Sequence, residues 1–479
     1  MASVQAAGIQ ILKGHVPEAV SSSRAVGQIP PATQLRLAVG LPLRNQADLD
    51  NLLQQLADPA SPNFRQYLTP AQFAERFGPT AEDYQALAAF FEANGFSVTG
   101  THPNRTILDV SGTAADINRT LHVNMTYWRH PTRGTFFAPD REPTVDAGVT
   151  ILDIAGLDNF VVPRPMDLKS RPLAEATPFT TGSGPSGLFN GGDFRAAYAP
   201  AVTLNGAGQS VGLFELDGFY ANDVKANFTE AGLAAVPTQT VLLDGFSDAP
   251  GSGNIEVTLD IMMAAYMAPG ASSIIVYEGT NPNDVLNRMA TDNLASQLSS
   301  SWGWSPTNAT TEQIFKQMVT QGQSLFQASG DSGAYTGAIM PPADDPNLTV
   351  VGGTSLTTAG AGGPWQSETT WSDSGGGIST TWPIPSYQTP ATMTAAGGSG
   401  TMRNIPDVAL IADVQIFLIC NNGQGVEVGG TSAAAPLWAG FLALANQQAA
   451  ANKKARVGFI NPLIYGIGGG SSFAADLHD

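Results

Sequence analysis

Two hydrophobic patterns divide the chain. From Phe189 onward, short runs of consecutive apolar residues alternate with amphipathic stretches, and each run ends near glycine, aspartate or serine. Examples of the runs are GQSVGLFEL, SSIIVYEG, SLFQASGDSG and NLTVVGGTS. Strands that are apolar on both faces and alternate with helices are typical of a parallel sheet covered on both sides. We therefore predict an α/β domain over residues 189–479, with its chemistry at the carboxyl ends of the strands.

The earlier part of the chain has a different pattern. TQLRLAVGLPL, FSVTG and RTILDVSG have the character of strands, whereas ADLDNLLQQLAD, TAEDYQALAAFFEANG and GTAADINRTLHV have helical periodicity. The order strand–helix–strand–strand–helix–strand, with the last strand directly after GTAADINRTLHV, predicts an α+β, ferredoxin-like domain. We assign residues 1–29 to an N-terminal segment and 30–161 to this domain. Residues 162–188, rich in Pro, Gly, Ser and Thr, are predicted to be an exposed linker that is open to proteolysis.

Charge is unevenly distributed along the chain. The net charge is −18, but residues 1–171 carry 14 Lys+Arg against 16 Asp+Glu, whereas residues 172–479 carry eight against 24. Such a polyanion disfavours binding to nucleic acid or to an anionic membrane. A segment with so few cations also cannot accumulate much positive charge in acid, so this composition favours acid tolerance. An acidic surface kept only for solubility is the other explanation.

Targeting and redox signals are sparse. No stretch approaches the roughly 18 consecutive apolar residues that a membrane span needs. The N-terminus lacks a continuous apolar core, so no complete secretory signal is visible. Cys420 is the single cysteine, which excludes an intrachain disulfide and a cysteine-based metal cluster. Because it lies in the apolar run VQIFLIC, we predict a buried structural thiol rather than a catalytic one.

The pentapeptide VGGTS occurs twice, ending at Ser355 and at Ser432. Ser432 precedes AAAPLWAGFLALANQQAA, an apolar helix that we expect to be buried, with Pro436 in its first turn. The N-terminus of a helix favours a developing anion, so Ser432 is either a candidate nucleophile or a simple N-cap. Ser355 leads into LTTAGAGG, which we interpret as a strand end turning into a loop.

The positions of the histidines limit which base a serine could use. The five are His15, His102, His122, His130 and His478, so none lies between 131 and 477. This distribution nearly excludes a Ser–His–Asp triad within the α/β domain and leaves a carboxylate or a lysine as the base. None of the four lysines of that domain lies in an apolar run, where burial would lower its pKa.

Carboxylates offer better candidates. Glu256 and Asp260 are four residues apart in the apolar stretch NIEVTLDIMMAAYM, so a helix would place them on one face. If this face is buried, the two share a proton, and Glu256 could accept the serine proton while Asp260 orients it. A solvated first turn stabilised by the helix dipole is the alternative. Asp331, after the run SLFQASG, is a ligand, a turn former, or an acid that donates a hydrogen bond to an oxyanion.

Taken together, these segments resemble the sedolisins, the serine-carboxyl peptidases, and among them the kumamolisin-like group. The family signature GTSxxxP is present at residues 430–436, and the Glu-x-x-x-Asp motif at 256–260. Further matching motifs are APGA at 268–271, SWG at 301–303, GDSG at 330–333 and PDV at 406–408. DPASPNFRQYLTPAQFAERFGPT and GLDNF, within residues 30–165, resemble the activation prodomain of the same family.

The resemblance implies a fold and a set of roles. The fold would be a subtilisin-like parallel-sheet catalytic domain preceded by the α+β ferredoxin-like prodomain. Ser432 would be the nucleophile, Glu256 the general base, Asp260 its partner and Asp331 the acid that stabilises the oxyanion. The resemblance also implies operation in acid, and it predicts that Ser355 is not catalytic.

A calcium site is the point where the chain departs from the family. The family's site opens with an aspartate followed by an aliphatic residue, here Asp476 and Leu477, but the glycine-rich loop and second aspartate do not follow. Because a hard cation needs about six or more oxygen ligands, we expect either a truncated C-terminus or a lost site. The resemblance further implies secretion, a monomer, protein or peptide substrates, and a prodomain that inhibits its own catalytic domain.

Two hypotheses follow. The first is an acid-acting endopeptidase made as a zymogen that cleaves itself within residues 162–188. The second is an inactive or incomplete homologue that acts as a binding protein, which the incomplete calcium site favours and the intact set of Ser432, Glu256, Asp260 and Asp331 opposes. A lipase-like or esterase-like hydrolase does not fit, since it needs a histidine and a G-x-S-x-G turn.

Overall fold

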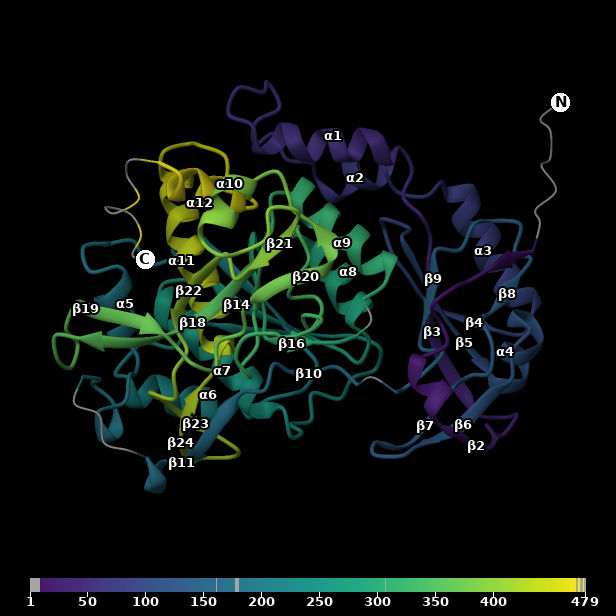
Figure 1. Ribbon diagram of the computed structural model, residues 1–479, viewed down its shortest axis with the longest axis horizontal. Helices are drawn as coiled ribbons and strands as arrows, with labels where there is room; N and C mark the ends of the chain where they lie inside the picture. Colours follow the sequence, from purple (N-terminus) through teal and green to yellow (C-terminus); the bar gives the residue numbers. More distant parts are fainter. Residues whose placement is uncertain are drawn as a thin grey trace. The chain divides into compact units, whose positions relative to one another are not determined.

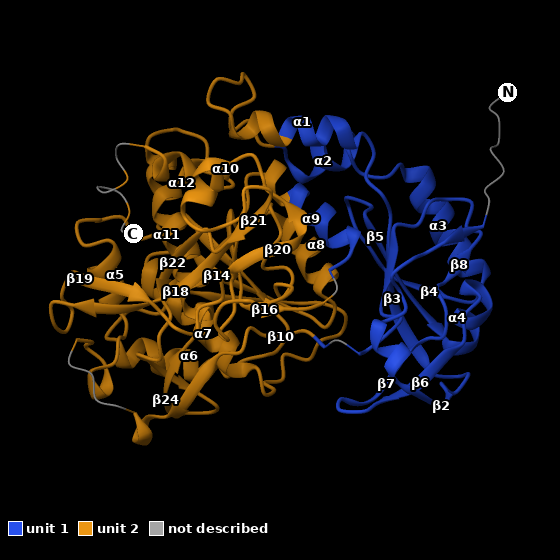
Figure 2. Ribbon diagram, viewed as in Figure 1, with its two compact units in different colours: residues 1–52, 68–162, 306–317 blue, residues 53–67, 163–305, 318–479 orange. Residues whose placement is uncertain are grey.

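The computed structural model describes residues 9–160, 162–176, 181–305, 307–470, 473 and 477. The chain forms two compact units (Figure 2). Unit 1 comprises residues 1–52, 68–162 and 306–317, and unit 2 comprises residues 53–67, 163–305 and 318–479. Among the described residues, no helix has the length and apolar character needed to cross a membrane.

Unit 1 contains a four-stranded antiparallel sheet in the order β4-β5-β3-β9. Its strands are β3 (Gln34–Gly40), β4 (Ser97–Thr101), β5 (Ile107–Thr113) and β9 (Asp153–Ala155). The helices of this unit are α1 (Gln46–Ala57), whose last turns belong to unit 2, α2 (Pro70–Arg76), α3 (Ala81–Ala93), α4 (Ala114–Leu121) and the start of α9 (Ala309–Thr320). Thr69, Thr80 and Thr113 cap α2, α3 and α4 by accepting a hydrogen bond from a backbone N–H of the first turn. This strand order is ferredoxin-like, as predicted.

The fourth strand of that sheet is not the segment that the sequence indicated. The strand after α4, β6 (Met125–His130), pairs instead with β2 (Arg24–Gln28) and β7 (Gly134–Pro139) in a separate sheet. β6 and β7 are joined by the short turn around PTRG, so their pairing costs less loop-closure entropy than pairing with a strand more distant in sequence. β9 therefore fills the vacant edge beside β3. A further pair, β1 (Gln10–Ile11) with β8 (Thr144–Val145), completes the sheets described in this unit.

Unit 2 is built on an eight-stranded sheet with the path β13-β14-β12-β15-β17-β18-β19, in which β22 also pairs with β18 (Figure 1). Neighbouring strands pair in parallel, with one exception: β18 and β19 pair antiparallel. The strands are β12 (Ser210–Glu215), β13 (Thr238–Leu242), β14 (Ser273–Glu278), β15 (Gln297–Ser300), β17 (Ser324–Ala328), β18 (Thr349–Thr358), β19 (Trp365–Thr370) and β22 (Val408–Ile411). The predicted parallel α/β sheet is confirmed. Its central strands β12, β14, β15 and β17 are buried almost throughout, as their apolar runs indicated.

Two buried helices of this unit carry Glu256, Asp260 and Ser432. α7 (Asn254–Met267) packs against α11 (Thr431–Ala451), and α11 also lies along β15, β17 and β18. The helices approach closely at Gly440, where an added Cβ would lie 2.8 Å from the Ala264 carbonyl oxygen. A glycine at this point therefore sets the distance between the two helices. The remaining helices are α5 (Asp193–Tyr198), α6 (Ala221–Glu230), α8 (Pro282–Asp292), α10 (Pro390–Ala395) and α12 (Asn461–Gly468).

The segment after residue 162 differs from an exposed linker. β10 (Arg164–Pro165) pairs antiparallel with β16 (Trp302–Gly303), and β11 (Lys169–Pro172) pairs antiparallel with β24 (Gln424–Gly429). β24 also forms a hairpin with β23 (Ile416–Cys420), and β20 (Gly377–Pro383) pairs with β21 (Met402–Ile405). Among the described residues, β10 is the one strand paired with β16, and β11 pairs with the edge of β24 that lies opposite β23. The pairing of this segment is not visible in a composition rich in proline.

Candidate active site

Glu256 and Asp260 lie one turn apart on α7, and neither side chain is exposed to solvent. Every residue of this helix from Glu256 to Met267 is buried, which excludes the solvated first turn that was the alternative. Burial raises the pKa of both carboxyl groups well above the usual range. The charge of Asp260 raises the pKa of Glu256 further. The pair therefore holds at least one proton under conditions in which ordinary carboxyl groups are ionised.

Ser432 is the second residue of α11, directly after the turn that follows β24. Its side chain is buried, and its Oγ has no hydrogen-bond partner among the described residues; the same is true of both carboxyl oxygens of Glu256. The Ser432 hydroxyl nevertheless lies near enough to Glu256 to lower the pKa of that carboxyl. Hydrogen bonds between a nucleophile and its base are often loose without substrate, so this arrangement fits a serine and its base.

Ser301 connects the two helices. Its Oγ lies 2.8 Å from Asp260 Oδ1 and 3.4 Å from the Ser432 carbonyl oxygen. That carbonyl is available because Pro436, four residues further along α11, has no N–H to donate to it. Pro436 is thus inside the helix and not in its first turn, where the sequence suggested it. The proline frees an acceptor through which Ser301 ties the start of α11 to Asp260.

Asp331 follows β17 and faces the same turn. Its Oδ1 accepts hydrogen bonds from the backbone N–H and the hydroxyl of Thr431, at 2.7 and 2.8 Å. Its Oδ2 has no partner among the described residues and points at Gly430, where an added Cβ would lie 2.6 Å away. Burial raises the pKa of Asp331 to about 7, although the bonds from Thr431 oppose this rise. Below that pH, Asp331 presents a proton beside Ser432 that it can donate to an oxyanion.

Sequence reasoning missed Glu215 and Trp302. Glu215 ends the central strand β12, is fully buried, and accepts a 2.8 Å hydrogen bond from the Trp302 indole N–H. Burial raises its pKa well above the usual range, and its charge in turn raises the pKa of Asp260. A glutamate that ends an apolar strand, in GQSVGLFEL, is the same signal that pointed to Asp331. Glu215 is therefore a third buried carboxyl in this set, next to Asp260.

The remaining candidates from the sequence lie elsewhere. Ser355 is inside β18, which continues to Thr358 instead of ending, and its hydroxyl donates to Asp413 Oδ2 at 2.6 Å. Cys420 is buried, and burial raises the pKa of its thiol to about 12, in agreement with a structural role. Asp476 lies outside the described residues.

Calcium has no donor set among the described residues near the C-terminus. Of the two predicted ligands only Leu477 is described, and its amide N–H donates to the Phe473 carbonyl oxygen. Six to eight oxygens are needed for calcium. Since Asp476 is not among the described residues, calcium binding at this site stays a prediction.

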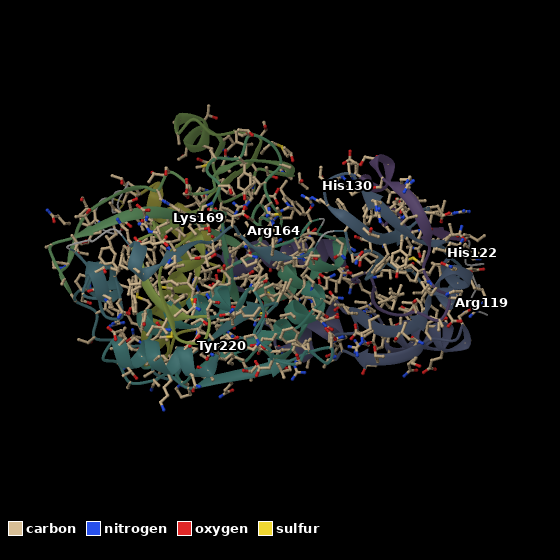
Figure 3. The ribbon with its side chains drawn as sticks, turned by 90° about the horizontal axis from the view of Figure 1, so that it is seen from below. Arg119, His122, His130, Arg164, Lys169 and Tyr220 are labelled. Carbon is tan, nitrogen blue, oxygen red and sulfur yellow. The ribbon has the colours of Figure 1, made fainter. Side chains whose placement is uncertain are left out.

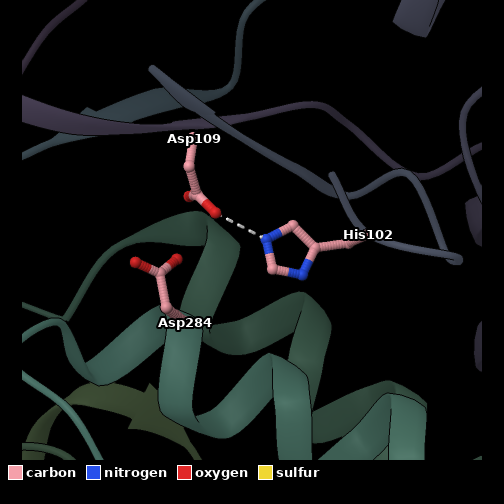
Figure 4. A group of neighbouring side chains, drawn as sticks. All are labelled: His102, Asp109 and Asp284. Carbon is pink, nitrogen blue, oxygen red and sulfur yellow. Dashed lines mark hydrogen bonds and ion pairs between the residues drawn. The ribbon is translucent and has the colours of Figure 1, made fainter. Parts of the chain in front are cut away.

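Four of the histidines have partners within unit 1. His102 Nε2 lies 2.9 Å from Asp109 Oδ2 (Figure 4, which also draws Asp284 of unit 2). His15 accepts the Ile154 N–H. His122 Nδ1 lies near the Thr144 carbonyl, and His130 accepts the Thr132 N–H (both histidines are labelled in Figure 3). His478 lies outside the described residues. The described part of unit 2 therefore offers Ser432 carboxyl groups, and no histidine, as a base.

The amino-acid sequence is similar to those of known peptidases. Residues 21–160 match the family described as "Pro-kumamolisin, activation domain". The chain is 30% identical to kumamolisin of Bacillus sp. (strain MN-32) over 492 aligned residues, which cover 95% of this chain and 87% of the relative. The chain belongs to the sedolisin family.

Two further sedolisins support the assignment. Sedolisin of Pseudomonas sp. (strain 101) is 28% identical over 85% of this chain and 75% of its own length. The solved structure of Pseudomonas sedolisin, a serine-carboxyl proteinase complexed with pseudo-iodotyrostatin, matches with a TM-score of 0.52 and 25% identity over 60% of this chain and 86% of that one. The predicted family and fold are confirmed, and the chain is a serine-type peptidase of the sedolisin family that carries a prodomain.

Proposed function

We propose that this sedolisin is an acid-acting endopeptidase in which Ser432 attacks the peptide bond and carboxyl groups replace histidine. The observation that carries the proposal is the burial of Glu256 and Asp260 on one turn of α7, beside the Ser432 hydroxyl, in a unit whose described part has no histidine. Four residues take part: Ser432 as nucleophile, Glu256 as general base, Asp260 as its partner and Asp331 as the oxyanion donor.

The steps follow from the positions of these groups. Ser432 Oγ bonds to the carbonyl carbon of the substrate while its proton passes to Glu256, and the protonated Asp331 donates a hydrogen bond to the oxyanion that forms. Collapse of this intermediate breaks the C–N bond, and Glu256 returns the proton to the leaving amine. Water then attacks the acyl group with Glu256 again as base, which releases the acid and restores Ser432.

Acid operation follows from the same groups. Asp331 can donate only while it is protonated, and its pKa of about 7 means that this donor is lost as the pH rises through neutrality. Burial raises the pKa of all three carboxyls, Glu215 raises that of Asp260 further, and Asp260 raises that of Glu256 further, so a proton stays on the set in mild acid. Activity should therefore fall on the alkaline side as these protons are lost.

Self-processing is the second part of the proposal. The Met166 N–H donates to the Ser301 carbonyl oxygen. Two residues later, Leu168 lies next to Gly430, because a Cβ added at Gly430 would lie 3.0 Å from Leu168 Cδ1. Arg164 and Lys169, on either side of these residues, are labelled in Figure 3. Between them Asp167 adopts a left-handed conformation (φ 73°), which bends the chain at the point where β10 leaves β16 and before β11 joins β24. These contacts support the proposal that the segment crosses the site as a substrate would and that the first cut falls between Met166 and Leu168.

The activity is tested with a matched pair of serines. The full chain would be assayed from about pH 3 to pH 8 on an internally quenched peptide that copies residues 162–175. Ser432→Ala should lower kcat by a factor of 10⁴ or more, and Glu256→Gln by about 10²–10⁴. Ser355→Ala, in the other copy of VGGTS, should retain activity. Equal loss in Ser355→Ala and Ser432→Ala, or activity that persists in Ser432→Ala, would refute the assignment.

Self-processing needs its own measurement. Intact-mass spectra of the full chain held at about pH 4 should show a new terminus between residues 166 and 168 in the wild type and none in Ser432→Ala. A cut far from this bend would contradict the proposed path of the segment. An inactive binding protein is not favoured, because all four proposed groups are present and brought together. Calcium binding, secretion and a monomeric state stay predictions from the family.

A further inference from the structure

The pairing of β11 with β24 bears on which side chains the peptidase selects on the carboxyl-terminal side of the cleaved bond. β11 pairs with β24 in a fixed antiparallel register, Lys169 opposite Gly429 and Arg171 opposite Glu427. β24 leads directly into Ser432, and β11 occupies the edge of β24 that lies opposite β23, so a peptide that took the place of β11 would run along this edge. Any peptide that binds this edge in the same register places one side chain over Glu427.

Glu427 is an unusual residue for this position. Its side chain has no exposed surface, although it belongs to a strand of a short hairpin. One carboxylate oxygen accepts a hydrogen bond from Arg171 Nε, and the other is buried without a partner among the described residues. Burying a carboxylate costs free energy unless a cation or several donors accompany it. Here the cation comes from the β11 segment itself.

Arg171 is bound as a ligand and not as part of the core. About 40% of its side chain stays exposed, whereas Glu427 beneath it is covered completely. The carboxylates of Glu427, Glu175 and Asp413 all raise the pKa of Arg171, so the guanidinium lies in a locally acidic surface. Glu427 and Asp413 lie outside residues 164–172, in other segments of unit 2.

We propose that Glu427 is a primed-side subsite of this peptidase, which selects an arginine or lysine side chain four or five residues after the cleaved bond. In the intact chain Arg171 occupies that subsite, and in the processed enzyme the basic residue of a protein substrate takes its place. The inference rests on the proposed function, because it requires that peptides cross Ser432 along β24. The buried second oxygen of Glu427 gives an incoming guanidinium a second acceptor, which favours arginine over lysine.

The test uses two peptides and two enzymes. One peptide copies residues 162–175, and the other carries glutamine at the position of Arg171. Each is cleaved by the acid-treated full chain at about pH 5, with processing verified by mass. The wild type should show about ten-fold higher kcat/KM for the arginine peptide, because the contact is charge-assisted but partly exposed to water. Glu427→Gln should cleave both peptides at the rate at which the wild type cleaves the glutamine peptide.

The design separates the possible failures. If the wild type cleaves neither peptide, the proposed peptidase function fails. If it cleaves both equally, or if Glu427→Gln keeps the ten-fold preference, only the subsite is refuted. Activity of Glu427→Gln on the glutamine peptide shows that the variant is folded, and Glu230→Gln, an exposed carboxylate on α6, controls for the loss of one charge. Lysine at the same position should give a value between those of arginine and glutamine.

Discussion

Replacing Asp331 by asparagine tests the proposed protonation of the site through stability, without any assay of activity. Asparagine keeps the shape of the side chain, and its carbonyl oxygen can accept the two hydrogen bonds from Thr431 that Oδ1 accepts now. Its amide nitrogen would take the place of Oδ2, which has no partner. The substitution therefore removes a titrating group while it preserves the contacts that hold it.

The magnitude follows from the pKa of Asp331. Burial raises it from 3.8 to about 7, and one pKa unit corresponds to about 1.36 kcal/mol, so the shift amounts to about 4 kcal/mol. The pKa of Asp331 is higher in the native state than in the unfolded state, so protonation of Asp331 stabilises the native state. Between about pH 4 and pH 7 the native state binds more protons than the unfolded state, so stability falls as the pH rises. This contribution is complete below about pH 4 and lost above about pH 7.

The measurement is urea unfolding at several values from pH 4 to pH 8, followed by tryptophan fluorescence. Of the seven tryptophans, all but Trp128 lie in unit 2, so the signal reports mainly on the unit that holds Asp331. Both proteins would carry Ser432→Ala, which prevents self-cleavage. Between pH 4 and pH 8 the Asp331→Asn variant should lose about 4 kcal/mol less than its parent, with Glu230→Gln as a control that follows the parent. Parallel curves for the parent and Asp331→Asn would refute the raised pKa.

Four further outcomes are expected. Glu215→Gln removes a charge that raises the pKa of Asp260, so the alkaline limb of the kcat/KM profile should move about one unit toward acid; an unchanged limb would contradict the link between the two carboxyls. Pro436→Ala restores an N–H to the Ser432 carbonyl, which should raise the thermal midpoint and lower kcat several-fold; a rise in both would exclude a role for the freed carbonyl. Asp407→Ala leaves the guanidinium of Arg403 buried without its 2.7 Å partner and should cost about 3–5 kcal/mol in urea unfolding, whereas a loss below about 1 kcal/mol would be inconsistent with that burial. Cys420, with a thiol pKa raised to about 12, should react with a disulfide reagent at pH 8 only after denaturation, and rapid labelling of the native protein would contradict its burial.

The sequence predicted those parts of the molecule in which one segment determines its own structure. The apolar runs of unit 2 became the strands of a parallel sheet because residues buried on both faces leave no other arrangement. Glu256 and Asp260 were identifiable because a four-residue spacing fixes one helix face. Ser432 was recognisable from the glycine turn before it and the apolar helix after it. The absence of histidine between 131 and 477 then left a carboxylate or a lysine as the base that a catalytic serine there could use.

The parts that were missed depend on contacts between distant segments. The pairing of β9 with β3, in place of β6, depends on a competing hairpin. Pro436 frees the Ser432 carbonyl, and the partner of that carbonyl, Ser301, comes from the distant segment between β15 and β16. The antiparallel pairing of residues 164–172 is with β16 and β24, strands that are distant in sequence, and no local pattern reveals it. Composition alone therefore indicated a linker where the structure has a strand.

The most direct test of the account is to trap the acyl-enzyme. The full chain would be mixed at about pH 4 with an activated ester of a short acylated peptide, quenched within milliseconds to seconds, digested and weighed fragment by fragment. The account predicts that the acyl group is found on the fragment that contains Ser432, that Ser355→Ala is labelled equally, and that Ser432→Ala is not labelled at all. Acylation at Ser355, or turnover in the Ser432→Ala variant, would contradict it.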